Sequence, residues 1–303
     1  MLAKFYIIPE SFADNLKLSA IEIEEKIKNL AQDFVLIKKY SDTNKIYVNH
    51  EIYSVIFING VTISELLFGP KTRERHIDRD VWLALQKIVI ESAGTELIID
   101  EILELLPNHN EEICYGLIAF NKIENISGEY QIVYSINDWY AFKRYFLGMY
   151  PHPNDGEYFI EECKKYFPNL FFHEENKKTV TYLLTDCSKK LIYHLTALND
   201  KFMDSYKMGT ERAQILKHFS LAAKLDEIAS LEGSASRKND FNFKFINDKG
   251  LLENVCCEPH LKLCYNDDPG DTSYSNDRRI YFHEGKENIQ QGRILIGHIG
   301  AHL

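Results

Sequence analysis

The sequence RRIYFHEGKENIQQGRILIGHIGAHL, residues 278–303, contains two runs rich in apolar residues on either side of a polar stretch with two glycines. Such runs are typical of β-strands, in which successive side chains point to opposite faces of a sheet. The first run would place Arg279, Tyr281 and His283 together on one face. We therefore expect the C-terminal part of the chain to be built around a sheet.

The second run, RILIGHIG (293–300), would place Ile294 and Ile296 on the face that carries His298. We expect it to pair with 278–282, so that ladder hydrogen bonds hold it and both isoleucines are buried. A histidine in such a place needs hydrogen-bond partners, because burying an unpaired polar group is costly. His298 is thus open to two interpretations, a structural histidine and a catalytic one.

Two more β-like runs, 241–248 and 251–265, precede this pair and are separated by an Asn, Asp and Gly turn. The section 157–231 has the apolar spacing of helices instead. Helices followed by consecutive antiparallel strands are the usual order of an α+β domain. We expect residues 233–303 to be an antiparallel β region that forms one domain with the helices before it.

The N-terminal half alternates between helical and strand patterns. Apolar residues at steps of three and four predict a helix over 21–38. The other predicted elements are β-rich runs within 45–60, helices over 79–93 and 96–106, and strands over 114–120 and 129–136. This alternation indicates a mixed α/β region.

The cluster PHPNDG (151–156) is the strongest predicted boundary, because Pro, Asn, Asp and Gly favour turns. The sequence therefore predicts an α+β protein in three parts. Residues 1–150 would be a mixed α/β recognition or regulatory region, 151–232 a mainly helical region and 233–303 the antiparallel β region.

Charge and hydropathy exclude several classes of protein. The net charge is -10 over 303 residues, which argues against a surface that coats nucleic acid and leaves only a few focused cations as a polyanion site. No run approaches the roughly 18 apolar residues of a membrane span, and the start does not resemble a signal peptide. Six scattered cysteines are expected to be free thiols. We expect a cytoplasmic protein without a membrane partner.

Polar side chains cluster in CEPHLKL (257–263). On a strand, Glu258, His260 and Lys262 would share one face, about 7 Å apart, and could act on a substrate together. The alternative is the solvated face of an edge strand, where charges are common. Nearby cysteines lack the paired CxxC spacing of zinc sites, so we expect neither a metal nor a cofactor.

Read in order, the C-terminal 95 residues resemble the RelE/HigB/ParE class of small bacterial toxins. A helical stretch is followed by RRIYF and then by ILIGHIG, and similar runs form neighbouring antiparallel strands in those toxins. The resemblance implies cleavage of mRNA without a metal by a few Arg, Lys, His, Tyr or Glu side chains. It nominates Arg278 or Arg279 and His298, with Lys262 as a basic strand residue.

These patterns predict a conditional RNA-cleaving effector of a bacterial toxin or phage-defence type. Glu258 or His260 would take the proton of the ribose 2′-OH. Lys262 and Arg279 would stabilise charge at phosphorus. The leaving oxygen would be protonated by His283 or by His298.

Two other functions stay open. One is a magnesium-dependent nuclease of the PD-(D/E)xK kind, with Asp248 as the first acid and His260-x-Lys262 as the second half of the motif. The other is a non-enzymatic module that binds a protein partner through the N-terminal region. NDWYAFKRYFLGMYPHP (137–153) contains six aromatic residues, which suits either a core helix or an interface.

Overall fold

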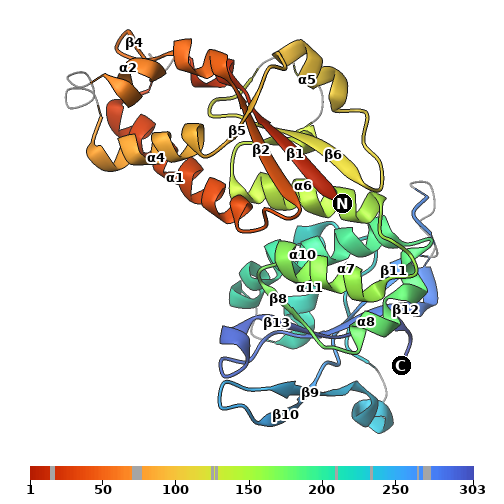
Figure 1. The fold of residues 1–303 in the computed structure, drawn as a ribbon. Coiled ribbons are helices and arrows are strands. Elements are labelled where there is room, and N and C mark those ends of the chain that lie inside the picture. The colour runs from red at the N-terminus through yellow and green to blue at the C-terminus, as the bar shows by residue number, and fades with distance from the viewer. Residues whose placement is uncertain are drawn as a thin grey trace. The chain divides into compact units, whose positions relative to one another are not determined.

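We describe a computed structural model that covers residues 1–13, 18–69, 77–123, 126, 129–208, 211–232, 235–264, 266–268 and 274–303. The chain divides into an N-terminal unit, Met1–Phe142, and a C-terminal unit, Lys143–Leu303. Both contain helices and sheets, so the predicted α+β class is confirmed (Figure 1).

The division falls inside helix α6 (Ile136–Met149), before the predicted turn cluster at 151–156. The first half of α6 packs on the N-terminal unit, where Phe142 lies 4.8 Å from Phe5 between ring centroids. The second half belongs to the C-terminal unit, where Arg144 Nε donates to the Tyr166 carbonyl at 2.8 Å. The predicted helical and β regions, 151–232 and 233–303, form a single unit.

The N-terminal unit is built on a five-stranded parallel sheet of order β5-β2-β1-β6-β7. Its strands are β1 (Leu2–Ile7), β2 (Asn44–Asn49), β5 (Ala93–Thr95), β6 (Ile113–Ile118) and β7 (Ile132–Val133). A small hairpin of β3 (Ile56–Ile58) and β4 (Val61–Thr62) adds a second sheet. The helices are α1 (Ala20–Lys38), α2 (Ile63–Phe68), α4 (Arg79–Ile90), α5 (Ile99–Leu105) and the first half of α6.

Helix α1 shows how local sequence fixes an element. Ser19 accepts a hydrogen bond from the Glu22 N–H, and the Glu22 carboxylate accepts from the Ser19 N–H, which closes a capping box. The predicted apolar face is buried, from Ile23 through Phe34 to Ile37. The helix expected over 21–38 is thus confirmed, one residue longer at its start.

The C-terminal unit begins with helices, as expected. They are α7 (Gly156–Tyr166), α8 (Asn176–Thr179), α9 (Thr181–Leu184), α10 (Ser188–Met208) and α11 (Arg212–Ala223). The strands are β8 (Leu170–Phe172), β9 (Asn242–Ile246), β10 (Leu252–Cys256), β11 (His260–Cys264), β12 (Tyr274–His283) and β13 (Ile294–Ala301).

These strands form two sheets. β9 and β10 make a separate antiparallel ribbon, and the main sheet has the order β11-β12-β13-β8. β12 pairs with β11 and β13 in antiparallel fashion, which confirms the pairing predicted for the RRIYF and RILIGHIG runs. β8 adds a parallel edge that the sequence did not predict, so this sheet is mixed and not purely antiparallel.

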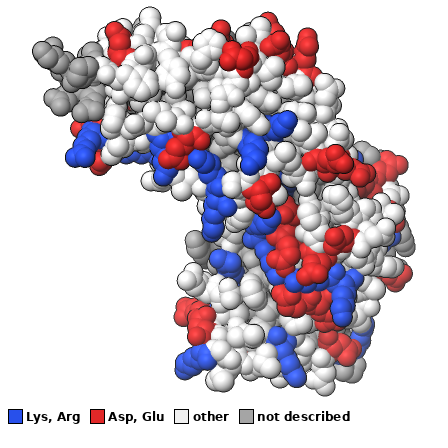
Figure 2. Space-filling view, in the orientation of Figure 1, with Lys and Arg blue, Asp and Glu red and all other residues white. Residues whose placement is uncertain are grey.

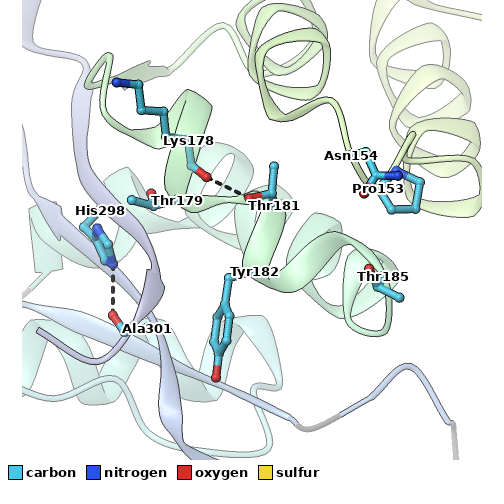
Figure 3. A pocket seen from close by; sticks show the side chains of 9 residues that line it. All are labelled: Pro153, Asn154, Lys178, Thr179, Thr181, Tyr182, Thr185, His298 and Ala301. Carbon is cyan, nitrogen blue, oxygen red and sulfur yellow. Dashed lines mark hydrogen bonds between the residues drawn. The ribbon is translucent and has the colours of Figure 1, made fainter.

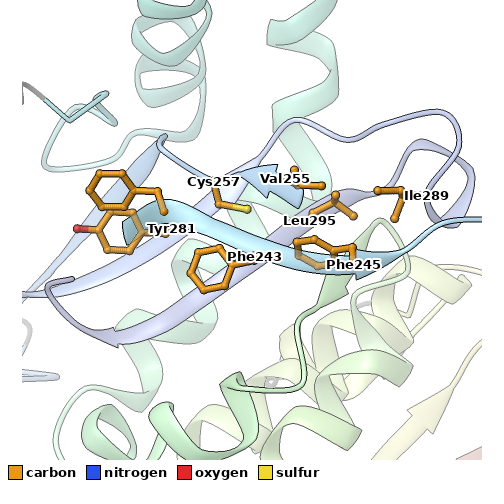
Figure 4. Packing of buried hydrophobic residues seen from close by; sticks show 8 residues of the cluster. Phe243, Phe245, Val255, Cys257, Tyr281, Ile289 and Leu295 are labelled. Atoms are coloured by element: carbon orange, nitrogen blue, oxygen red, sulfur yellow. The ribbon is translucent and has the colours of Figure 1, made fainter. Parts of the chain in front are cut away.

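The ribbon and the main sheet share a hydrophobic core (Figure 4). Its buried members are Phe241, Phe243, Phe245, Val255, Cys257, Tyr281, Ile289 and Leu295. A Cβ on Gly297 would lie 2.6 Å from the Phe243 ring, so glycine is what lets the ribbon approach β13 this closely. On the helical side, Phe202 of α10 packs edge-on against Phe282 at 5.3 Å.

All six cysteines carry free thiols. Of the helices that the structure describes, none combines the length and the apolar composition needed to cross a membrane.

Candidate functional site

Three side chains from different segments converge on the carboxylate of Glu232. The Tyr281 hydroxyl donates to Glu232 Oε1 at 3.2 Å, His302 Nε2 lies 3.4 Å from the same oxygen and His260 Nδ1 lies 3.7 Å from it. We call Glu232, His260, Tyr281 and His302 the Glu232 cluster. It is a group of acid, base and phenol side chains at the border between protein and solvent.

Backbone pairing builds this cluster. His260 is the first residue of β11 and stands opposite Tyr281 of β12. The His260 and Ser230 backbones exchange two hydrogen bonds, 2.9 and 3.2 Å long, which brings Glu232 to the end of the sheet. The His302 N–H donates to the Asp277 carbonyl at 2.7 Å, so the segment after β13 is held beside β12.

The same face carries two cations. Lys262 and Arg279 are cross-strand partners two residues along from the His260 and Tyr281 pair. Lys262 Nζ lies 3.4 Å from Glu227 Oε2, and Arg279 is only 6% exposed. Two adjacent cations beside a general base are a suitable arrangement for a phosphodiester, which gains negative charge in its transition state.

Burial sets the protonation of His260. Desolvation lowers the pKa of this imidazole to about 4, against the opposing field of Glu232 and with help from Arg279 and Lys262. His260 is therefore neutral at pH 7. Its Nδ1 faces two acceptors, Glu232 Oε1 at 3.7 Å and the Glu258 carbonyl at 3.4 Å, so Nδ1 carries the proton.

The other nitrogen of His260 is consequently free to accept a proton. Ser230 Oγ lies 3.2 Å from Nε2 and donates to it. Hydroxyl, imidazole and carboxylate thus follow one another as they do in a proton-transfer triad. Tyr281 stays a neutral phenol, because burial and Glu232 both raise its pKa.

Glu258 and His283 belong to a second group around Arg212. Arg212 makes a two-pronged contact with Glu284, 2.5 Å from Nε to Oε1 and 2.7 Å from Nη2 to Oε2. Glu258 Oε2 lies 4.0 Å from Arg212 Nη1, and His283 Nδ1 lies 3.8 Å from Glu284 Oε2. Burial opposes ionisation of Glu284, but Arg212 outweighs it and lowers the pKa of the carboxyl.

The expectation that Glu258 shares a strand face with His260 and Lys262 was wrong. β11 begins only at His260, because Pro259 has no N–H to donate to a ladder. The structure therefore brings together His260, Lys262 and Arg279 of the predicted residues.

His298 and Arg278 belong neither to the Glu232 cluster nor to the group around Arg212. The His298 ring centroid lies 6.2 Å from that of Tyr281, but its Nε2 donates to the Ala301 carbonyl at 2.9 Å. Arg278 Nη2 pairs with Asp186 Oδ2 at 2.8 Å, outside the Glu232 cluster.

Glu232, His302 and Ser230 are the residues that sequence reasoning missed. His302 is the penultimate residue, and chain termini usually fray, so its position in the sequence does not point to a site. Its spacing of four from His298 was the available signal. Glu232 and Ser230 follow helix α11 in a segment without strand periodicity, and nothing local marks them.

The magnesium-dependent alternative takes Asp248 as its first acid, and Asp248 does not lie at the Glu232 cluster. Asp248 is exposed at the tip of the β9–β10 ribbon, where its N–H donates to the Asn288 carbonyl at 2.9 Å. Within the described ranges, no group of three or more His, Cys, Asp or Glu side chains has a metal-binding arrangement.

The surface charge is interleaved on the face that Figure 2 shows, with acidic and basic side chains side by side. In the C-terminal unit, Lys177 Nζ lies within 3.2 Å of carboxylates of Glu157, Glu161 and Glu174. This cation is already surrounded by three carboxylates. Lys262, which meets the single carboxylate of Glu227 at 3.4 Å, and Arg279 are the cations that would hold a polyanion.

Comparison with protein-family models found no match to this chain, and searches of curated proteins and of solved structures found none either.

Proposed function

We propose that the C-terminal unit is a metal-independent endoribonuclease, the cleaving part of a conditional effector of a bacterial toxin or phage-defence type. The observation that carries this proposal is the convergence of His260, Tyr281 and His302 on Glu232, next to the cross-strand pair of Lys262 and Arg279. Such a site needs no metal to activate a hydroxyl or to stabilise charge.

In this reaction the ribose 2′-oxygen attacks the adjacent phosphorus and the bond to the 5′-oxygen breaks. The 2′-OH gives its proton to Ser230 Oγ, which passes its own to His260 Nε2. Glu232 stabilises the imidazolium through Nδ1, as the acid of a triad does. A protonated His302 gives its proton to the departing 5′-oxygen. The products are a 2′,3′-cyclic phosphate and a 5′-hydroxyl.

Lys262 and Arg279 would bind the phosphate oxygens on which charge builds up. Their field also lowers the proton affinity of His260, and a bound phosphate would offset that field. Substrate binding would thus raise the pKa of His260 towards the pH at which the enzyme works.

The antiparallel pairing of β12 and β13 supports the resemblance to RelE/HigB/ParE toxins, in which similar runs are neighbouring antiparallel strands. The N-terminal unit would control when the C-terminal unit is active. Its five-stranded parallel sheet is a separate folding core with its own helices.

The test is cleavage of a short single-stranded RNA in EDTA by the parent chain and by two variants. We expect His260→Ala and Arg279→Ala each to slow cleavage about 100-fold or more. Lys249→Ala, in the exposed ribbon turn, is the matched control and should cleave like the parent. A 2′-deoxy nucleotide at the cut site should block the reaction, and cleavage that requires added Mg²⁺ would contradict the proposal.

A second candidate is a hydrolase in which Ser230 is the nucleophile. The order Ser230, His260 and Glu232, with Ser230 Oγ 3.2 Å from His260 Nε2, favours it. Ser230→Ala separates the two functions. A relay role predicts a loss of about tenfold in RNA cleavage, because water can replace the hydroxyl, whereas a nucleophile role predicts complete loss of ester hydrolysis.

A further inference from the structure

A cavity of about 500 Å³ in the C-terminal unit is lined by His298, whose ring centroid lies 6.2 Å from that of Tyr281 in the Glu232 cluster (Figure 3). His298 and Ala301 of β13 form one wall, Pro153 and Asn154 lie on the other side, and residues of α8 and α9 lie between them. This volume is within the range of pockets that bind small molecules.

Tyr182 offers the cavity an aromatic face. It lines the cavity and is 50% exposed. The Arg278 guanidinium carbon lies 5.7 Å from its ring centroid, and Asp186 holds Arg278 at 2.8 Å. A tyrosine positioned in this way is a stacking platform for a base.

Three polar groups of the cavity can accept a hydrogen bond. Thr181 Oγ1 donates to the Lys178 carbonyl at 2.8 Å and Thr179 Oγ1 to the Glu175 carbonyl at 3.5 Å, so both oxygens keep lone pairs to accept with. His298 is 5% exposed, and its Nε2–H is used by Ala301. Among the described residues its Nδ1, an acceptor in the neutral ring, has no hydrogen-bond partner.

Burial lowers the pKa of His298 and keeps the ring neutral at pH 7. A buried acceptor without a donor is costly, so a ligand N–H that reaches it gains an interaction that water does not supply. Lys178, exposed at the rim, could meet a phosphate.

We propose that this cavity binds a nucleobase with an exocyclic amino group, stacked on Tyr182 and donating to His298 and the two threonines, next to the scissile phosphate of the RNA. This proposal rests on the proposed function for its substrate. The amino group is what the cavity would recognise, because it can donate hydrogen bonds to these acceptors. The keto oxygen of a uracil or hypoxanthine is itself an acceptor, so its lone pairs would repel those of the cavity.

Titration of the full chain with two matched pairs of mononucleotides tests the cavity without any cleavage. Adenosine monophosphate has an amino group and an unprotonated ring nitrogen where inosine monophosphate has a keto oxygen and a ring N–H, and cytidine and uridine monophosphate differ in the same way. We expect the amino-bearing member of each pair to bind about tenfold more tightly. Tyr182→Ala should weaken the binding of adenosine monophosphate and of cytidine monophosphate about tenfold. The control Tyr206→Ala removes a helix tyrosine of similar exposure, 44%, outside the cavity.

Mapping the cut sites of the parent and of Tyr182→Ala on a random RNA completes the test. A preference for an amino-bearing base beside the cut, lost in Tyr182→Ala and kept in Tyr206→Ala, supports the proposal. Equal binding within each nucleotide pair, or unchanged cut sites, overturns it. If the parent does not cleave RNA, the proposed function is wrong, whereas the titrations still decide whether the cavity binds an amino-bearing base.

Discussion

At the scale of single residues, the C-terminal unit is defined by a few buried polar groups that depend on one another. Glu232 accepts from Tyr281 and stands beside two histidines, His260 and His302. Because burial lowers the pKa of His260, its protonation affects both folding and chemistry.

His260 should make the protein sensitive to acid. Its pKa in the folded chain is about 4, below the ordinary value of about 6.5, so protonation favours the unfolded chain. The stability is complete above pH 6.5 and falls progressively towards pH 4, by up to roughly 3 kcal/mol for this residue. Urea unfolding at pH 7.5 and 4.5 should show a smaller acid loss in His260→Gln than in the parent. Equal losses would contradict the assignment.

Gly297 should be intolerant of a side chain. An added Cβ would lie 2.6 Å from Phe243 Cδ2 and 2.9 Å from Cys257 Cβ, so Gly297→Ala must push the ribbon away from β13. We expect a loss of about 1–3 kcal/mol in the free energy of unfolding. Gly94→Ala, with open space around it, is the control and should differ little from the parent by thermal unfolding.

At the scale of elements, β13 is the strand on which the C-terminal unit depends. It lies between β12 and β8, and its apolar residues Ile294, Leu295 and Ile296 are fully buried. Burying two isoleucines alone contributes roughly 3–6 kcal/mol, a large share of the stability of a domain.

Two truncations separate folding from activity. Deleting 293–303 should abolish the cooperative unfolding transition of the C-terminal unit. Deleting 301–303 should keep that transition, because β12 and β13 still pair. The shorter deletion also removes His302 from Glu232, so we expect it to reduce RNA cleavage about 100-fold. Circular dichroism on heating and a cleavage assay measure the two effects, and a folded 1–292 chain would show that β13 is peripheral.

At the scale of the whole molecule, helix α6 contributes to two cores. Trp139 and Phe142 are fully buried, with Phe142 against Phe5, whereas Arg144 and Gly148 bond within the C-terminal unit. Each unit has its own sheet and its own buried side chains.

We expect residues 136–303, which keep α6 intact, to fold alone and to cleave RNA without the N-terminal unit. A regulatory N-terminal unit predicts that this fragment stops bacterial growth when it is expressed. The same fragment with His260→Ala should fold and be harmless. A fragment with no cooperative unfolding transition would show that the C-terminal unit needs its neighbour in order to fold.

Periodicity carried the local part of the prediction. The spacing of Ile23, Phe34 and Ile37 indicated the buried face of α1, and alternation indicated that β12 and β13 pair. It also placed His260 and Lys262 on one face. The prediction failed at Glu258, where Pro259 interrupts the ladder.

The sequence by itself determined the α+β class, the helix faces and the antiparallel pair near residues 278–300, because each depends on residues close together in the chain. Tertiary structure alone decided three features. β8 pairs with β13 in parallel, Glu258 and His283 lie in the group around Arg212, and Glu232 lies beside His302. These contacts join residues up to 124 positions apart, as in the pairing of Leu170 with Ile294. Local patterns show which residues share a face only while a strand is regular. The expectation that Ile296 shares the face of His298 was wrong, because the bulge in the β12–β13 pair leaves them on opposite faces. Packing of the complete chain selects the residue that each side chain meets.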